Sequence, residues 1–269
     1  MSLIFIGAGN MAGALIGGLL ASGRPASQIR AIDPHEPTRR KVANRFGITV
    51  AEHAEAFAAD DVIVLAVKPQ VMREVAGSLA DKLAGNLIIS VAAGILMSDL
   101  GRWLGGHERL IRVMPNTPAL IGQGISALVG GTAATDADMT TAETLLATVG
   151  PVLRLDVETQ LDAVTAVSGS GPAYVFRWME AMMAAADDVG LAPDQARALV
   201  LQTFKGAAEL ALASDEAPGV LRANVTSKGG TTAAALAVMD DAEIGDLVLR
   251  AVRAARDRSI ELGRELGGA

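Results

Sequence analysis

Short apolar segments alternate with helical patterns through the first half of the chain. The apolar segments have the length of buried strands and lie at Leu3–Ile6, Ile29–Ile32, Val62–Val67, Leu87–Val91 and Leu110–Met114. Helical patterns follow them at Met11–Ala21, Pro37–Phe46, Gln70–Leu79 and Met97–Leu104. Strands that are apolar on both faces need helices on both sides of their sheet. This half is therefore expected to form a doubly wound, mostly parallel α/β sheet, which Gly122–Gly131 and Val152–Leu155 extend by further strands.

The second half of the chain carries helical patterns alone. They lie at Glu158–Val167, Ala173–Val189, Pro193–Leu212, Pro218–Asn224, Thr231–Met239 and Ile244–Leu262. Pro172, Pro193 and Pro218 stand where the first turn of a helix tolerates proline, and Gly190 follows a helix as a C-terminal cap should. The sequence thus predicts a first domain of residues 1–156 and an all-helical second domain of residues 157–269.

Composition and charge restrict the class of protein. Hydrophobic residues make up 51% of the chain but aromatic residues only 3%, so a large core must be built from Ala, Leu, Val and Ile. The net charge of −7 argues against a nucleic-acid partner, because the phosphates would be repelled. The chain contains no cysteine, which excludes disulfides and thiolate metal sites and fits the reducing cytoplasm.

The uncharged segment at residues 1–23 has the features of neither a signal peptide nor a membrane span. No basic region precedes it, and glycines interrupt it. It is expected to form the first strand, turn and helix of a soluble domain, and no membrane partner is expected.

A glycine-rich turn joins the first expected strand to the first expected helix. It matches the G-x-G-x-x-A form of the dinucleotide-binding fingerprint, with the residues Gly7-Ala8-Gly9-Asn10-Met11-Ala12. The first glycine permits a tight turn, the second leaves room for a pyrophosphate, and the alanine keeps the helix close to the sheet. Backbone N–H groups at the helix start then bind the phosphates. The alternative, a glycine-rich turn without a ligand, is disfavoured by the strand before it and by the acid that ends the second strand.

That acid bears on which nicotinamide cofactor the turn would bind. Asp33 stands where a carboxylate usually bonds the adenine ribose hydroxyls and disfavours a 2′-phosphate. Arg39 and Arg40 follow it and are able to neutralise that phosphate, or else belong to a solvated helix face. Both NADH and NADPH remain open as the cofactor.

Several further segments stand out in a fixed order along the chain. In the first half they are Ile6–Ala12, Ala66–Gln70, Ser90–Ile95 and Arg112–Pro118, and in the second half Val167–Phe176 and Val225–Thr232. Each alone is modest evidence. Together, in this order and spacing, they resemble the pyrroline-5-carboxylate reductase family, and the resemblance spans nearly the whole chain.

This resemblance implies a Rossmann domain followed by a helical dimerisation domain, with the active site between them. Such a protein would be a homodimer or a larger homo-oligomer that reduces the cyclic imine 1-pyrroline-5-carboxylate to L-proline with NADH or NADPH. The resemblance also implies that the cofactor is contacted by the loop Ala66-Val67-Lys68-Pro69, by Ala92 and by Asn116. These loops would follow the carboxyl ends of strands, where open α/β sheets bind ligands.

Two positions depart from the family pattern. Lys228 stands where the family often has proline, which bears on the rigidity of its loop. His53 stands where family members commonly have asparagine near the adenine ribose, which bears on how the chain distinguishes NADH from NADPH.

The usual acid–base residues are scarce in this chain. It has 3 histidines, His35, His53 and His107, none in a recognisable motif, so each is expected to be a surface residue rather than a catalyst. An alcohol–ketone reaction needs a proton relay, whereas a ring imine is protonated near neutral pH before it binds. The protein then has mainly to hold the imine carbon against the nicotinamide and to exclude water. No His–Glu metal spacing occurs, so no metal site is expected.

A loop of small residues before an alanine-rich helix is the expected substrate site. It comprises Ser227, Lys228, Gly229, Gly230, Thr231 and Thr232. Its backbone N–H groups form an anion cradle suited to the substrate carboxylate, and the Ser227 hydroxyl is expected to add to it. The family resemblance implies that Thr232 bonds the ring nitrogen and is the catalytic residue. Thr231 has the alternative role of a helix N-cap, which is compatible with substrate binding.

A second run of small residues, Ser168–Pro172, is expected to interrupt a long helical stretch. Small residues there allow close approach of the backbone to another helix or to a ligand. Ser170 is assigned to the substrate site on the strength of the resemblance.

Two other functions compete with the reductase. A β-hydroxyacid dehydrogenase shares the Rossmann-plus-helices plan but relies on a lysine with an asparagine one helical turn later, whereas Lys205 is followed there by Glu209. A non-catalytic, cofactor-sensing protein is the other alternative. An anion cradle far from the cofactor turn argues against it.

Overall fold

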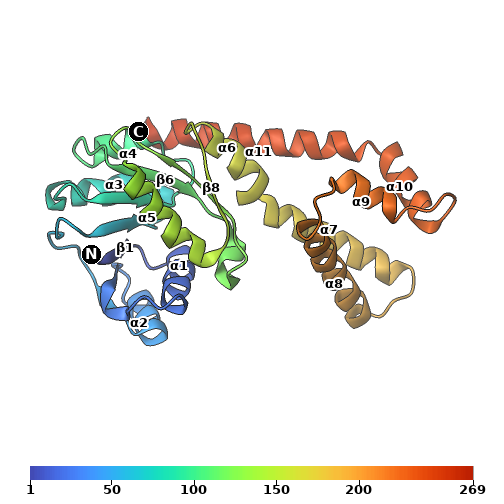
Figure 1. Cartoon of the computed structure of the whole chain (residues 1–269), viewed down its shortest axis with the longest axis horizontal. Coiled ribbons are helices and arrows are strands. Elements are labelled where there is room, and N and C mark those ends of the chain that lie inside the picture. Colours follow the sequence, from blue (N-terminus) through green and yellow to red (C-terminus); the bar gives the residue numbers. More distant parts are fainter. Residues whose placement is uncertain (269) are drawn as a thin grey trace. The chain divides into compact units, whose positions relative to one another are not determined.

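The computed structural model describes residues 1–268, which form two compact units (Figure 1). The first unit comprises Met1–Ser170 together with the residues from Ala254 onward, and the second is Gly171–Arg253. The expected boundary at residue 156 follows the end of the last strand at Arg154. The division by compactness falls later because Leu161 and Leu266 pack against the hydrophobic core of the sheet-containing unit.

The first unit is built on one eight-stranded sheet with the order β3-β2-β1-β4-β5-β6-β7-β8. The strands are β1 (Leu3–Ile6), β2 (Ile29–Ile32), β3 (Thr49–Ala51), β4 (Val62–Leu65), β5 (Leu87–Ser90), β6 (Leu110–Met114), β7 (Ser126–Gly130) and β8 (Val152–Arg154). Neighbouring strands run parallel except for the antiparallel pair β6–β7. The doubly wound, mostly parallel sheet predicted from the sequence is confirmed.

Helices cover both faces of this sheet (Figure 1). On one face, α1 (Asn10–Ala21), α2 (Glu36–Phe46) and α5 (Asp136–Leu146) pack against alternate strand residues such as Leu3, Phe5 and Val64. On the other face, α3 (Pro69–Leu79) and α4 (Met97–Trp103) pack against the intervening residues, such as Ile4 and Ile63. Successive side chains of a strand point to opposite faces, so the continuous apolar runs serve two cores at once.

Two strands end earlier in the structure than the sequence predicted, and the residues left over form loops at the carboxyl edge of the sheet. β4 ends at Leu65 and β5 at Ser90, so Ala66, Val67 and Val91 leave the sheet. Backbone hydrogen bonds still tie these turns across the edge, from Gly7 N–H to the Ile32 carbonyl (2.8 Å), from Ala66 N–H to Ile6 (2.8 Å) and from Val91 N–H to Leu65 (3.1 Å). The chain leaves β1 towards β2 on one side and meets β4 on the other, which makes this edge the topological switch point.

β3 and α5 were not predicted from the sequence. β3 has only 3 residues and lies at the sheet edge, so it carries little periodic signal. α5 begins with a capping box in which the Thr135 hydroxyl accepts the Asp138 N–H and the Asp138 carboxylate accepts the Thr135 N–H. A two-pronged hydrogen bond from Arg109 lowers the pKa of the Asp138 carboxyl to about 2, so this cap stays ionised at neutral pH.

The second unit is helical, as predicted. It contains α7 (Gly171–Asp188), α8 (Pro193–Leu212), α9 (Pro218–Asn224), α10 (Thr231–Asp241) and the beginning of α11 (Ile244–Gly267). Helices α7 and α8 form a hairpin (Figure 1). The turn after α7 contains Gly190 at φ +94°, a backbone conformation that favours glycine.

The expected helix break at Ser168–Pro172 takes a different form. Helix α6 (Gln160–Val164) continues into the π-helical turn η5 (Thr165–Gly169), and after Ser170 the chain re-enters a helix at Gly171. Pro172 is accommodated in the first turn of α7 because the N–H that it lacks has no partner there anyway. The small residues therefore widen one helical turn rather than forming a loop, and such π turns are frequent at functional sites.

Candidate active site

The turn after β1 requires glycine at its first position. Gly7 has φ +92°, and a Cβ atom there would lie 2.8 Å from Val67 Cγ1 and 2.9 Å from the Ala66 carbonyl group. The turn after β1 and the loop after β4 are thus in direct backbone contact. These two loops were assigned to the cofactor from separate motifs, and the close contact at Gly7 shows that neither has room for a larger residue there.

The next residues of this turn leave the start of α1 open. Gly9 is the N-cap of α1, and apart from Gly9 and its two chain neighbours no atom among residues 1–268 lies within 4 Å of the position that a Cβ would take on it. The N–H groups of Asn10 and Met11 have no partner within the helix because they belong to its first turn. Ala12 is fully buried against the sheet. The protein itself therefore has room for a side chain at position 9. The free N–H groups beside that space suit a phosphate.

Two cavities flank this turn. One of about 160 Å³ lies beside Gly9 and Asn10 and is also lined by Thr38, Lys41 and Arg45. The other, of about 340 Å³, lies between the strand ends and α3, with lining residues that include Ile32, Pro34, Glu52, His53, Val67 and Glu74. A pyrophosphate at the first and an adenosine at the second would match the plan of a dinucleotide site at a switch point. The residues present therefore fit the expected cofactor.

Asp33 lies directly after β2 and is held in place by the backbone. Its two carboxylate oxygens accept the N–H groups of Ala8 and His35, each at 2.9 Å. Arg39 is not part of a solvated helix face, because its Nη1 donates to the carbonyl oxygens of Asp33 (2.8 Å) and Pro34 (2.7 Å). Arg40 does belong to such a face: its side chain is 75% exposed and pairs with the glutamate one turn before it.

The remaining residues expected at the cofactor lie on the same edge of the sheet. Lys68 is exposed and occupies the N-cap position of α3 without a capping bond from its side chain, and Pro69 is the first residue of that helix. Ala92 is buried just beyond β5. Asn116 follows β6, and its side-chain oxygen accepts the Ile125 N–H at 3.0 Å, which ties down the loop before β7. The structure thus collects along one edge the residues that were expected to line the cofactor site.

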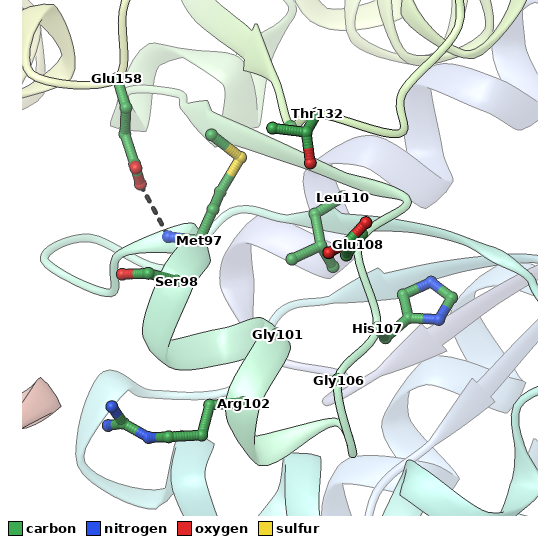
Figure 2. Close-up of a pocket in the computed structure, with 11 residues that line it drawn as sticks. Met97, Ser98, Gly101, Arg102, Gly106, His107, Glu108, Leu110, Thr132 and Glu158 are labelled. Atoms are coloured by element: carbon green, nitrogen blue, oxygen red, sulfur yellow. Dashed lines mark hydrogen bonds between the residues drawn. The ribbon is translucent and has the colours of Figure 1, made fainter.

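A further cavity, of about 380 Å³, is lined by none of the residues predicted for cofactor or substrate (Figure 2). It runs along α4 and reaches the start of β6, where His107, Glu108 and Leu110 line it. Glu158 stands at one end and accepts the Met97 N–H at 2.8 Å (Figure 2). The cavity is consequently separate from the expected cofactor site.

A buried ion pair beside this cavity was missed from the sequence. Arg112 in β6 is almost fully buried, and its Nη1 lies 2.9 Å from Glu158 Oε1, the oxygen that also accepts the Met97 N–H. Removing one member of such a pair costs about 3–5 kcal/mol, because the other charge is left buried. The available signal was an arginine within an otherwise apolar strand, Leu110–Met114.

In the helical unit, the loop before α10 has the shape expected of an anion site. Gly229 has φ +70°, a conformation that favours glycine, and a Cβ on Gly230 would lie 2.5 Å from Ser227 Oγ, so a larger residue there would displace the Ser227 hydroxyl. Gly230 N–H donates to the Ser227 carbonyl at 3.1 Å, which closes the turn. Ser227 and Lys228 are exposed.

The N-cap of α10 is Gly230 rather than Thr231. Thr231 is the first residue within the helix, and no side chain caps this end among the described residues. The first intrahelical bond runs from the Ala234 N–H to the Gly230 carbonyl at 3.1 Å, so the N–H groups of Thr231, Thr232 and Ala233 remain free of helical partners. The capping role considered for Thr231 is therefore wrong, and the helix start is open to an anion.

The π turn η5 packs closely against the end of β6. A Cβ on Gly169 would collide with the side chain of Met114. Within residues 1–268, the buried Ser168 hydroxyl has no hydrogen-bond partner. Ser170 N–H donates to the Thr165 carbonyl at 2.8 Å, and its side chain is partly buried. These observations favour close packing as one reason for the small residues, and they leave the assignment of Ser170 to the substrate as a prediction.

The three histidines lie apart from the loop before α10 in the sequence and do not share one environment. His107 is partly buried, and its ring bonds the Asn86 carbonyl at 2.8 Å; His35 and His53 are exposed. Residues 1–268 contain no cluster of carboxylates and histidines that could hold a metal ion. Across the same residues, no helix combines the length and apolar character that crossing a membrane requires.

Two protein-family models match successive parts of the chain. Residues 2–94 match a family described as NADP oxidoreductase, coenzyme F420-dependent, and residues 158–262 match the pyrroline-5-carboxylate reductase dimerisation family. The first match contains the open turn at Gly9, and the second contains the loop before α10.

Full-length relatives carry the same assignment. A curated pyrroline-5-carboxylate reductase of Pseudomonas aeruginosa is 50% identical over 98% of each chain. Among solved structures, a pyrroline-5-carboxylate reductase from Coxiella burnetii is 35% identical and covers 97% of this chain and 98% of its own, with a TM-score of 0.91. A Plasmodium falciparum pyrroline carboxylate reductase, solved with NADP bound, is 28% identical over 98% of both chains, with a TM-score of 0.85. The chain belongs to the pyrroline-5-carboxylate reductase family.

Proposed function

We propose that this protein is an NAD(P)H-dependent reductase that converts 1-pyrroline-5-carboxylate into L-proline. The observation that carries the proposal is the end-to-end match to curated pyrroline-5-carboxylate reductases, which includes both the cofactor turn and the loop before α10. The cysteine-free composition supports the cytoplasm as its place of action.

The cofactor is held by the carboxyl edge of the sheet. The N–H groups of Gly9–Met11 would hold its phosphates, and the carboxylate of Asp33 would bond the adenine ribose. Ala66–Pro69, Ala92 and Asn116 would line the nicotinamide half. The bound dihydronicotinamide supplies the hydride. The residues of the edge would fix the orientation of the cofactor, because the backbone bonds between neighbouring strand ends hold their turns in place.

The substrate is held by the loop before α10. Its carboxylate accepts the free N–H groups of Thr231, Thr232 and Ala233 and the hydroxyl of Ser227, while Gly229 and Gly230 keep the loop tight around it. Thr232 orients the ring nitrogen through its hydroxyl. Ser170 contributes a further small polar group. Each of these contacts positions the substrate, which is the main requirement for transfer to an already electrophilic carbon.

The chemistry of an imine explains why no strong acid or base is needed beside it. A ring imine that is protonated near neutral pH carries its positive charge into the site. That charge makes the imine carbon electrophilic, so the carbon is already activated to accept a hydride. The histidines of the chain are exposed or bonded to the backbone. The Thr232 hydroxyl therefore acts by accepting a hydrogen bond from the protonated nitrogen and not by donating a proton to it.

The alternative assignments gain no support. Lys205 is exposed on α8 and lies 3.7 Å from Glu209, so the lysine–asparagine pair of β-hydroxyacid dehydrogenases is replaced by a surface ion pair. A cofactor-sensing protein without turnover would have no use for the loop before α10. An absorbance assay at 340 nm with the imine and either dinucleotide separates turnover from sensing, since only turnover consumes the dinucleotide continuously.

The helical unit is proposed to join two copies of the chain. Among the described residues of α7, none is buried, and Phe176 is 60% exposed. An apolar groove of about 340 Å³ lies within this unit and is lined mainly by Tyr174, Trp178, Leu247, Val248 and Val252. Apolar surface of this extent on helices marks an interaction site. The matched family model is itself one of dimerisation, so the second copy is the occupant.

Sedimentation should therefore give a dimer or a larger homo-oligomer at micromolar concentration. Trp178→Glu should dissociate it, because a charge in an apolar interface is left without a partner. Leu153→Glu is a suitable control, since Leu153 is an exposed apolar residue of β8 in the other unit. A well-folded monomer of the unchanged protein at micromolar concentration would contradict the proposal.

A further inference from the structure

The loop between β5 and α4 is anchored at its far end by a side chain that is distant in the sequence. The loop comprises residues 91–96, and Met97 is the first residue of α4. The Met97 N–H donates to Glu158 Oε1 at 2.8 Å, across 61 positions of the chain (Figure 2). The first N–H groups of a helix have no partner within it, so this bond satisfies a donor that α4 itself leaves free.

Glu158 holds the neighbouring strand with the same oxygen. Arg112 lies in β6 opposite Ser90, the last residue of β5, and its Nη1 is 2.9 Å from Glu158 Oε1. The Arg112 side chain is only 4% exposed, so separating the pair would leave a charge buried without a partner. One carboxylate oxygen therefore joins the loop after β5 to β6.

The two segments that Glu158 joins lead to residues that would line the nicotinamide half of the cofactor. Ala92 lies in the loop after β5, and Asn116 stands just beyond the end of β6. Hydride transfer depends on how the nicotinamide is placed against the imine carbon, and a displacement of about 1 Å can lower such a rate by roughly a hundredfold. A bond that fixes these segments relative to each other therefore bears on the rate.

We propose that Glu158 is a positioning residue for hydride transfer. Without touching cofactor or substrate, it fixes the loop after β5 against β6 through the Met97 N–H and Arg112, and so sets the place of the nicotinamide ring. The inference rests on the proposed function, because it requires transfer from a dinucleotide bound at this edge of the sheet. Dinucleotide affinity should depend little on Glu158, since the phosphates would be held at the separate turn after β1.

The test is a single-turnover measurement by stopped flow. The protein saturated with reduced dinucleotide is mixed with saturating 1-pyrroline-5-carboxylate, and a dinucleotide deuterated at the transferable position identifies the hydride step, because only that step is slowed. The rate constant reports the geometry of the bound pair, whereas the amplitude reports how much of the protein is folded. A role in stability alone would thus change the amplitude and leave the rate constant as it is.

Three variants of Glu158 separate the reach of the side chain from its charge. Glu158→Ala removes the acceptor and should lower the rate constant about tenfold. Glu158→Asp keeps the charge but is one methylene too short to reach both donors, so it should also slow the step. Glu158→Gln keeps an oxygen at the same reach that can accept both N–H groups, and it should restore most of the rate.

Asp138→Ala is the matched control. Asp138 is likewise buried and likewise accepts an arginine, Arg109, and a backbone N–H, that of Thr135. It stands at the start of α5, after β7, and β7 ends opposite the beginning of β6. Its removal should therefore lower the melting temperature and leave the rate constant of hydride transfer unchanged.

Unchanged rate constants in Glu158→Ala and Glu158→Asp, beside an active wild type, would overturn this inference, and so would an equal loss of rate in Asp138→Ala. Should Glu158→Ala fail to fold by circular dichroism, the other two variants decide: a slow Glu158→Asp beside a fast Glu158→Gln upholds the inference, and equal rates refute it. A wild-type protein that transfers no hydride would overturn the proposed function and this inference with it, so the two failures are distinguishable.

Discussion

Replacing Gly9 by valine is expected to weaken NADH and NADPH binding alike, by about a hundredfold or more. The added side chain would occupy the space above the free N–H groups at the start of α1, and each lost hydrogen bond to a charged phosphate is worth about 1.5–3 kcal/mol. Two such bonds account for a hundredfold change in dissociation constant. Titration of the variant with each dinucleotide measures the effect directly.

The same substitution should leave the fold intact, which makes the result interpretable. Gly9 has φ −72°, which valine adopts readily, and no described atom beyond the adjacent residues lies within 4 Å of the new Cβ. Gly77→Val in α3 is the matched control, because that exposed glycine also has open space around its Cβ position. A Gly9→Val variant that binds dinucleotides as tightly as the control would refute the assignment of the phosphate site.

Gly7 would be a poor choice for this experiment. Its positive φ and the close approach of Val67 and Ala66 mean that any side chain strains the turn itself. Loss of binding there would not distinguish a blocked phosphate site from a displaced loop. The two glycines of this motif thus serve different purposes. Gly7 is needed by the fold of the turn, whereas Gly9 leaves space for the ligand.

Thr232→Ala is expected to lower turnover tenfold to a hundredfold while changing NADH affinity little. Losing one hydrogen bond that positions the ring nitrogen costs on the order of 1–3 kcal/mol, which corresponds to that range of rates. Ser227→Ala should instead raise mainly the Michaelis constant, because its hydroxyl would hold the carboxylate in both the ground state and the transition state. Steady-state kinetics with varied imine concentration separate the two effects.

The helix should survive both changes, because the structure removes the role once considered for Thr231. No described side chain caps α10, so neither threonine at its start contributes a capping bond that a substitution could break. Thr144→Ala controls for loss of a threonine hydroxyl elsewhere. Thr144 lies in α5, and its hydroxyl donates to the Thr140 carbonyl at 2.8 Å. Full activity of Thr232→Ala, or activity lost together with melting temperature, would show that the loop is structural.

The sheet was predictable because strands buried on both faces read as uninterrupted apolar runs. Leu3–Ile6, Ile29–Ile32 and Leu110–Met114 have the same bounds in the sequence prediction and in the structure. The short edge strand Thr49–Ala51 carries no such run. Asp136–Leu146 alternates small polar and apolar residues, and its start is specified by a local capping box that the apolar pattern does not register.

What the sequence could not reveal is contact between segments that are distant along the chain. The approach of Ala66 to Gly7, and of Gly169 to Met114, explains glycines that looked like features of their own motifs. The pairing of Arg112 with Glu158 joins residues 46 positions apart and gives no periodic signal. The π-helical turn before Pro172 could not be predicted either, because a widened helical turn and a loop both favour small residues such as those at Ser168–Pro172.

The most direct test of the account is to follow the hydride. The protein is given 1-pyrroline-5-carboxylate and NADH deuterated at the transferable position, and the products are analysed by mass spectrometry and NMR. The account predicts L-proline that carries one deuterium on the ring carbon that had been the imine carbon, formed in step with oxidation of the dinucleotide. Proline without deuterium, or no oxidation of NADH or NADPH in the presence of the imine, would contradict it.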